Sequence, residues 1–423
     1  MSDGESAMTA GWPLPEGVTA RRIDGVNGLS MHVLEAGADG QRPLVLLLHG
    51  FPELSYSWRR VLPALAAAGW HAVAPDQRGY GLTTGWRGGY DDDLGPFRLP
   101  ALVDDAVALV EALGHRSVAA LVGHDFGAVV GAWAALLRPD VFRSVVLMSA
   151  PFAGPPTQAA AAGSVAAGSA AAGPAAAGSA TAGSATAGSA TAGSATAGSA
   201  AGAPSIHEAL AALPRPRKHY QWYYATRDAD ADMRYAAQGL HAFLRAYYHM
   251  KSADWPGNDP EPLADWTAAA LQRLPTYYVM DRDLGMAATV APEMPAPAAV
   301  ATNRWLTEAE LAVYAQAFER TGFQGALNWY RCKVGEPFVA ELSRYEGRTI
   351  DVPSMFIAGA RDWGIHQSPG ALERMQRTAC TRMEAVHLID GAGHWVQQEQ
   401  SDAVNRLLVE FLSRHGDAAR RQP

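Results

Sequence analysis

The stretch Val122-Gly123-His124-Asp125-Phe126-Gly127 decides the fold that we expect for this chain. An apolar run, Ser117 to Leu121, precedes it, and a segment of small residues with helical character, Ala128 to Leu137, follows it. A strand, a sharp turn with glycine on both flanks, and a helix that begins at once are typical of a turn that exposes a nucleophile. Because Asp125 stands where serine is commoner, we expect attack on an alkyl carbon and an ester of the enzyme's own side chain.

The composition indicates a globular protein with a sizeable core. Of the 423 residues, 48% are hydrophobic and 18% are charged, which suits one large domain with an insertion, or two domains. The formal net charge of -8 argues against a nucleic-acid partner, because nucleic-acid-binding proteins usually present a basic face.

Cysteine usage and hydropathy bear on the compartment. Cys332 and Cys380 are the two cysteines, too few for a disulfide framework and without the spacing of metal ligands. No run of about 18 apolar residues occurs, so we expect no membrane span. The sequence therefore predicts a cytoplasmic protein, with no metal in its site.

From residue 18 onward, strand and helix patterns alternate along the chain. Residues 18–36 alternate at period two about a turn-rich centre and predict a β-hairpin. Apolar runs at 44–48, 71–74 and 144–148 are typical of strands buried on both faces, and helical patterns lie between them. This alternation predicts an α/β fold, with a mostly parallel central sheet and helices on both faces, whose first part spans residues 1–153.

An abrupt change of composition follows at residues 154–204, which consist almost entirely of Ala, Gly, Ser and Thr. Such a segment has almost no large apolar group to bury and cannot offset the entropy of ordering it. Alanine favours a helix, but the recurring glycines each cost about 1 kcal/mol there. We expect a disordered linker.

The remaining chain divides into a cap and a second core part. Residues 205–345 are rich in Trp and Tyr and show helical runs such as 233–248, which predicts a mainly helical cap. Strand patterns return at 354–358 and 383–389, so residues 346–423 are expected to complete the core. The cap is thus inserted before the last strands.

A nucleophilic aspartate needs a base that activates water against its ester, and histidine oriented by an acid suits that task. Asp362 follows the returning strand and His394 follows the last one, so both lie at the sheet edge where ligands bind. Taken singly, Asp362 could be a helix cap and His394 a structural histidine. Asp390 is the rival acid, only four residues before His394. The order nucleophile, acid, histidine favours Asp125, Asp362 and His394 as a triad.

Ester hydrolysis passes through an oxyanion, which needs backbone N–H donors. The fold logic places one on Phe126, directly after the nucleophile. It places the other in the loop His49-Gly50-Phe51-Pro52, where we expect Phe51 to donate. The alternative for that loop is a tight turn without a catalytic role.

The chain resembles the epoxide hydrolases of the α/β-hydrolase fold in five motifs. Three lie in the core and two in the cap: His49-Gly50-Phe51-Pro52, Asp76-Gln77-Arg78-Gly79-Tyr80-Gly81, Gly123-His124-Asp125-Phe126-Gly127, Tyr220-Gln221-Trp222-Tyr223-Tyr224 and Gly322-Phe323-Gln324-Gly325-Ala326-Leu327-Asn328-Trp329-Tyr330-Arg331. The resemblance implies the α/β-hydrolase fold, and it implies a reaction that needs no metal and no organic cofactor.

The resemblance also implies roles for cap residues. Tyr330 and Tyr220 would hold the epoxide oxygen and supply its proton, because an alkoxide leaves poorly without one. Tyr223 is the alternative to Tyr220. The resemblance further implies that Trp222, Tyr223 and Trp329 line the substrate pocket.

Phe126 bears on the alternatives, since many relatives carry tryptophan there and haloalkane dehalogenases tend to use its N–H to hold halide. We therefore expect opening of an apolar epoxide by water to a vicinal diol. The alternative enzyme is a haloalkane or related dehalogenase with the same Asp-His-Asp triad. The alternative of another class is a non-catalytic ligand-binding member of the fold.

Overall fold

The computed structural model describes residues 11–158 and 204–416. The disorder predicted for residues 154–204 falls mostly on 159–203, which lie outside the described residues. Within the described ranges, no helix is long and apolar enough to cross a bilayer.

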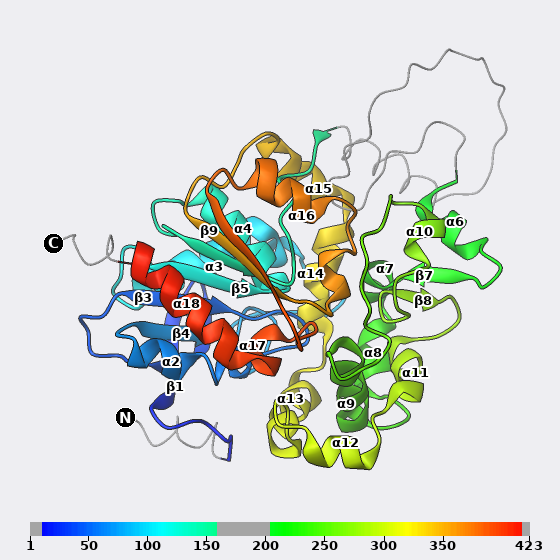
Figure 1. The fold of residues 1–423 in the computed structure, drawn as a ribbon, viewed down its shortest axis with the longest axis horizontal. Coiled ribbons are helices and arrows are strands. Elements are labelled where there is room, and N and C mark those ends of the chain that lie inside the picture. The colour runs from blue at the N-terminus through cyan, green and yellow to red at the C-terminus, as the bar shows by residue number, and fades with distance from the viewer. Residues whose placement is uncertain (1–10, 159–203, 417–423) are drawn as a thin grey trace.

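An eight-stranded sheet forms the centre of the core, in the order β1-β2-β4-β3-β5-β6-β9-β10 (Figure 1). Its strands are β1 (Val18–Val26), β2 (Leu29–Ala36), β3 (Leu44–Leu48), β4 (His71–Pro75), β5 (Ala120–His124), β6 (Val145–Met148), β9 (Ser354–Gly359) and β10 (Met383–Ile389). The pairs β1–β2 and β2–β4 are antiparallel, and every other pair in this sheet is parallel. The predicted mostly parallel sheet is confirmed.

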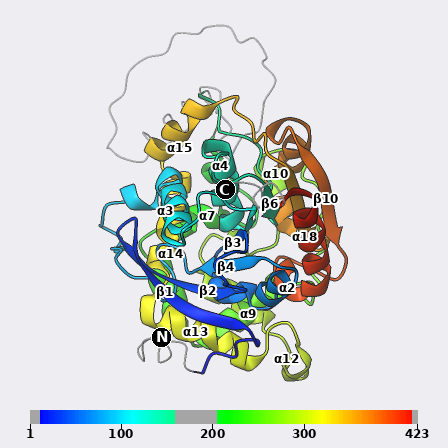
Figure 2. The ribbon, with the colours of Figure 1, turned by 90° about the vertical axis from the view of Figure 1, so that its left-hand side faces the viewer.

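Helices cover both faces of the sheet, which explains why its central strands are apolar without alternation. Every residue of β3, β4, β5, β6 and β9 is buried. Helices α3 (Leu99–Ala112) and α4 (Phe126–Leu137) pack on one face, and α2 (Leu62–Ala67) and α18 (Ser401–His415) on the other (Figure 2). Shorter helical segments of the core are η1 (Ser55–Trp58), η2 (Gly95–Phe97), η6 (Trp363–Ile365), α16 (Ala371–Arg374), η7 (Met375–Ala379) and α17 (Val396–Glu399).

Between β6 and β9, the described residues 204–345 form a mainly helical segment, most of which lies beside the core in Figure 1. Its helices are α6 (Ile206–Ala211), α7 (Tyr220–Tyr224), α8 (Ala229–Arg234), α9 (Leu240–Lys251), α10 (Ala268–Leu271), α11 (Met286–Val290), η4 (Ala291–Glu293), α12 (Pro297–Thr302), α13 (Glu308–Thr321), α14 (Gln324–Val334), α15 (Glu336–Leu342) and η5 (Ser343–Tyr345). Figure 1 shows α14 at the boundary between cap and core.

Two features of the cap differ from the sequence expectation. The helical run at 233–248 is interrupted between α8 and α9, because Gly239 has a positive φ of 82° that a continuous helix does not permit. A two-stranded antiparallel ribbon also forms from β7 (Arg217–His219) and β8 (Val279–Asp281). Three-residue strands are too short for an alternating pattern to be recognised.

Candidate active site

Asp125 lies in the turn between β5 and α4, with φ 52° and ψ -117°. A positive φ is unfavourable for a residue with a side chain, and such strain gathers at functional sites. The turn is tight because a Cβ on Gly123 would lie 2.1 Å from the Gly127 carbonyl oxygen, and one on Gly127 would lie 2.1 Å from that of Leu48. The two glycines are therefore required by backbone approach, and they set the position of Asp125 between them.

His394 lies between the two predicted carboxylates. Its Nδ1 is 3.1 Å from Asp362 Oδ2, and its Nε2 is 3.5 Å from Asp125 Oδ2. Because Nδ1 faces a carboxylate, the neutral ring carries its proton there and presents a free Nε2 toward Asp125. The side chains of His394 and Asp362 are 1% and 2% exposed, whereas that of Asp125 is 15% exposed. The rival acid, Asp390, is exposed. Of the two carboxylates that flank His394, Asp125 is therefore the accessible one.

The charges of the site keep both carboxylates ionised. Burial alone would raise the pKa of Asp125, but His394, Lys251 and His124 outweigh it and lower that pKa far below its ordinary value. Burial likewise opposes ionisation of Asp362, and the pKa of Asp362 is lowered by the charge that His394 carries when it is protonated and by the hydrogen bond between the two residues. Asp125 is thus an anion throughout the neutral range, which the nucleophilic role predicted for it requires.

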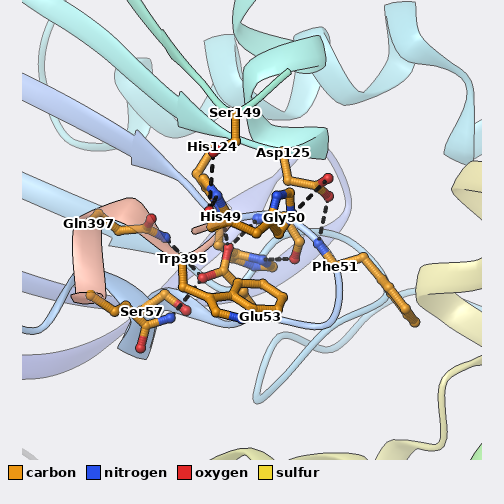
Figure 3. A network of polar contacts seen from close by, with 12 residues as sticks. His49, Gly50, Phe51, Glu53, Ser57, His124, Asp125, Ser149, Trp395 and Gln397 are labelled. Atoms are coloured by element: carbon orange, nitrogen blue, oxygen red, sulfur yellow. Dashed lines mark hydrogen bonds and ion pairs between the residues drawn. The ribbon is translucent and has the colours of Figure 1, made fainter. Parts of the chain in front are cut away.

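Backbone donors lie beside the Asp125 carboxylate. The Phe51 N–H donates to Asp125 Oδ1 at 3.1 Å, so the loop after β3 reaches the nucleophile (Figure 3). Phe126 occupies the first position of α4, where a helix N–H has no acceptor within its own helix. One N–H therefore already holds an Asp125 oxygen, and the second lies on the adjacent residue.

A buried ion pair that the sequence motifs did not reveal lies next to Asp125 (Figure 3). His124 Nδ1 is 2.5 Å from Glu53 Oε2, and its Nε2 is 2.7 Å from the His394 carbonyl oxygen. Since both partners are acceptors, both ring nitrogens must donate and His124 is an imidazolium. Burial disfavours that charge, yet Glu53 raises the pKa of His124 above its ordinary value. The signal in the sequence was a histidine inside the motif around Asp125 and an acid directly after the motif His49-Gly50-Phe51-Pro52, and neither residue reveals its partner.

Lys251 is a second residue near the site that the sequence did not reveal. The backbone carbonyl of Lys251, at the end of α9, accepts the His394 N–H at 2.8 Å. Its ammonium lies 4.9–5.7 Å from the centroids of four rings, those of Tyr278, Tyr247, Trp395 and Tyr277. A single lysine in a helical run carries no motif, so only the tertiary structure reveals its position.

Tyr220 and Tyr330 lie close together, and Tyr330 packs against the rings of Phe51 and Phe126. The ring centroids of the two tyrosines are 5.9 Å apart, and the Tyr330 ring lies 5.5 Å from Phe51 and 4.8 Å from Phe126. The Tyr220 hydroxyl donates to Gln367 Oε1 at 3.0 Å. Burial, and then the charge of Asp125, raise the pKa of both phenols well above the ordinary value. Both hydroxyls therefore keep their protons in the physiological range.

Tyr223, the alternative to Tyr220, is engaged elsewhere. Its hydroxyl donates to Asp232 Oδ2 at 2.5 Å and accepts the Met286 N–H at 3.4 Å. These partners belong to α8 and α11 within the cap. The hydrogen bonds thus direct Tyr223 toward the cap interior, whereas Tyr220 and Tyr224 both lie beside Tyr330, with ring centroids 5.9 Å and 4.9 Å away. The Tyr224 hydroxyl is hydrogen-bonded to that of Tyr247 at 3.3 Å.

The two tryptophans expected in the substrate pocket differ in their surroundings. Trp329 is buried, and its ring lies 5.5 Å from that of Phe126. The Trp222 ring packs at 4.5 Å from His207 and 5.1 Å from His219, both within the cap. Trp329 is therefore brought to the nucleophile turn, whereas the ring contacts of Trp222 are made with the cap.

Comparison with known proteins assigns this arrangement to a family. The model of the alpha/beta hydrolase fold matches residues 43–400. Epoxide hydrolase B of Mycobacterium tuberculosis (strain ATCC 25618 / H37Rv) is 33% identical over 404 residues, covering 92% of this chain and 97% of that protein. Epoxide hydrolase A of the same strain is 31% identical over 404 residues, covering 94% and 98%.

Solved structures give the same result. An epoxide hydrolase from an endophytic Streptomyces superposes with a TM-score of 0.69 at 31% identity, covering 94% of this chain and 96% of that one. Epoxide Hydrolase A from Mycobacterium thermoresistibile gives a TM-score of 0.67 at 30% identity, covering 94% and 98%. The chain therefore belongs to the α/β-hydrolase fold family and, within it, to the epoxide hydrolases, which are hydrolases acting on the ether bond of an epoxide.

Proposed function

We propose that this chain converts an apolar epoxide to a vicinal diol through a covalent alkyl ester on Asp125. The observation that carries the proposal is one anionic, accessible carboxylate that lies within 3.5 Å of a buried histidine. A protonated phenol, Tyr330, packs against Phe126 of the same turn, and a second, Tyr220, lies beside Tyr330. Neither step below requires a metal or an organic cofactor.

In the first step, Asp125 Oδ2 attacks an epoxide carbon. Oδ1 is the oxygen that Phe51 N–H binds, which leaves Oδ2 free to form the new bond. As the carbon–oxygen bond breaks, Tyr220 and Tyr330 hold the leaving oxygen and one of them transfers its proton to it. Protonation matters because an alkoxide is a poor leaving group in water and in a pocket.

In the second step, water attacks the ester at the Asp125 carboxyl carbon. His394 Nε2 accepts a proton of that water, and Asp362 stabilises the resulting imidazolium at Nδ1. The oxyanion forms on Oδ1, where Phe51 N–H already lies and Phe126 N–H is adjacent. Collapse of the intermediate breaks the bond to the substrate oxygen, which takes the proton from His394, and the second proton of the water restores the phenol that was deprotonated in the first step. The diol leaves, and Asp125 is again a carboxylate.

The partners that we propose are the epoxide and water. The aromatic surroundings of Tyr330, Phe51, Phe126 and Trp329 support an apolar substrate. The net charge of -8 supports the absence of a nucleic-acid partner. Cys332 and Cys380 are both free and buried, which supports a cytoplasmic location.

The test is the variant His394→Gln, which removes the base of the second step and leaves the first intact. We expect the ester to accumulate, so that intact-mass measurement after addition of styrene oxide detects protein heavier by the mass of the substrate. A parallel assay compares diol from styrene oxide with halide from a haloalkane in the wild type. Absence of an adduct, or halide release without diol, would contradict the proposal.

A further inference from the structure

A small hollow lies beside Phe126, on the side formed by α3, α4, α14 and α15. Its apolar walls include Phe97, Leu102, Phe126, Val129, Trp329 and Leu342, and its charged residues are Arg98, Lys333 and Glu341. The volume of about 20 Å³ holds one or two groups of the size of water. A carboxylate group fits such a space, whereas an aromatic ring is too large for it.

The charges in this hollow do not balance. Arg98 Nη1 lies 2.7 Å from Glu341 Oε1, so these two residues neutralise each other. Within residues 11–158 and 204–416, Lys333 makes no hydrogen bond or ion pair, and its Nζ contacts the Phe126 ring at 5.4 Å from the centroid. The hollow therefore keeps one cation in excess, in otherwise apolar surroundings.

Lys333 shares a helix face with a proposed proton donor. It follows Tyr330 by three residues on α14, the spacing that places side chains side by side. The Tyr330 ring lies 4.8 Å from the Phe126 ring, and the Lys333 ammonium approaches the same ring. Burial lowers the pKa of Lys333 while the Asp125 charge raises it, so the ammonium lies within electrostatic reach of the nucleophile.

Lys251 is a useful comparison, because aromatic rings and not an open hollow surround its ammonium. Four aromatic rings surround its ammonium, and the residue is 4% exposed. Cation–π contacts satisfy that charge without a ligand. Lys333 has one ring contact, is partly exposed and lines the hollow, so its charge is open to an incoming anion.

We propose that Lys333 binds a carboxylate of the substrate, so that the preferred epoxide is compact and apolar with a carboxylate a short distance from the oxirane. The inference rests on the proposed epoxide hydrolysis. The distance is short because Phe126, the residue directly after Asp125, is itself a wall of the hollow. An ion pair in apolar surroundings is stronger than one in water, and the bound anion keeps Lys333 protonated.

The experiment compares 4-carboxystyrene oxide with its neutral 4-carboxamide in the wild type and two variants. We expect the wild type to prefer the acid about tenfold in kcat/KM, equivalent to about 1.4 kcal/mol, and mainly through KM. Lys333→Met should abolish the preference, and Lys333→Arg should retain most of it. The matched control is the double variant Arg98→Gln/Glu341→Gln, which removes the neutral pair from the same hollow and leaves Lys333 as its excess cation, so the preference should persist.

A long-chain acid tests the predicted spacing. An epoxide separated from its carboxylate by ten or more methylene groups should show no Lys333-dependent preference over its amide. Equal or better turnover of the carboxamide in the wild type, or an acid preference that survives Lys333→Met in a folded variant, would overturn the inference. Diol from the carboxamide without any acid preference refutes only the carboxylate site, whereas no diol from either compound or from styrene oxide refutes epoxide hydrolysis itself.

Discussion

The two halves of the candidate site are held in place by different means. On the core side, the backbone positions Asp125: glycines pack against carbonyl oxygens on both sides of the turn, and Phe51 N–H holds one carboxylate oxygen. On the cap side, Tyr220 is positioned by side chains, through Gln367 and the neighbouring rings. The position of Asp125 is thus determined by short sequence motifs, whereas the position of Tyr220 depends on contacts with residues distant in sequence.

This difference predicts that a substitution of a core residue of the site abolishes turnover, whereas a substitution of a cap residue only lowers it. Backbone contacts leave no alternative conformation for Asp125. The phenols form a pair in which one hydroxyl can partly replace the other.

The largest effect is expected for Asp125→Ala, which removes the nucleophile. Turnover of styrene oxide should fall by at least about 10⁴-fold, because no other carboxylate of the triad is accessible. Diol formation under single-turnover conditions measures this loss, and thermal unfolding serves as the control for folding. Appreciable diol formation by the folded variant would remove Asp125 from its proposed role.

An intermediate effect is expected for the lid phenols. Tyr220→Phe and Tyr330→Phe should each lower kcat by about 10- to 100-fold, and the double variant by about 10³-fold or more, within the range of general acid catalysis. The burst of ester formation should slow in the same order, since the proton is needed in the first step. A double variant with near wild-type kinetics would show that the two hydroxyls do not act on the epoxide.

The smallest effect is expected for Gln367→Ala, which leaves Tyr220 intact but removes the acceptor of its hydroxyl. Loss of one neutral hydrogen bond is worth roughly 1 kcal/mol, so kcat should fall about fivefold. Tyr223→Phe is the matched cap control: its hydroxyl bonds Asp232, so stability should decrease while kcat stays within about twofold. A larger kinetic loss in Tyr223→Phe than in Gln367→Ala would reverse the assignment of the first lid tyrosine.

The core could be predicted from sequence because its signals are local. Strand β3 (Leu44–Leu48) was predicted with the same bounds, since a strand buried on both faces is a continuous apolar run. The turn at Asp125 was recognised because each glycine is required by a contact inside or next to the motif.

The cap and the charges were harder to predict because they depend on tertiary packing. Gly239, with a positive φ, stands directly before α9 in the break after α8, where helical periodicity alone would continue. Strand β7 pairs with a segment about sixty residues further along the chain. Glu53 and Lys333 are single charged residues in a sequence. Their partners, His124 and the Phe126 ring, can be identified only after the chain has folded.

The imidazolium of His124 joins three parts of the chain that are far apart in sequence. His124 itself directly precedes Asp125, and its two ring nitrogens donate to Glu53 and to the His394 carbonyl oxygen. The residues that hold Asp125 in place are therefore encoded in three separate segments of the gene. A chimaeric gene that takes its elbow from one relative and its first loop or last loop from another keeps every motif intact, yet it pairs a buried cation with acceptors selected for a different neighbour. Recombination within this fold should succeed where all three segments come from the same parent.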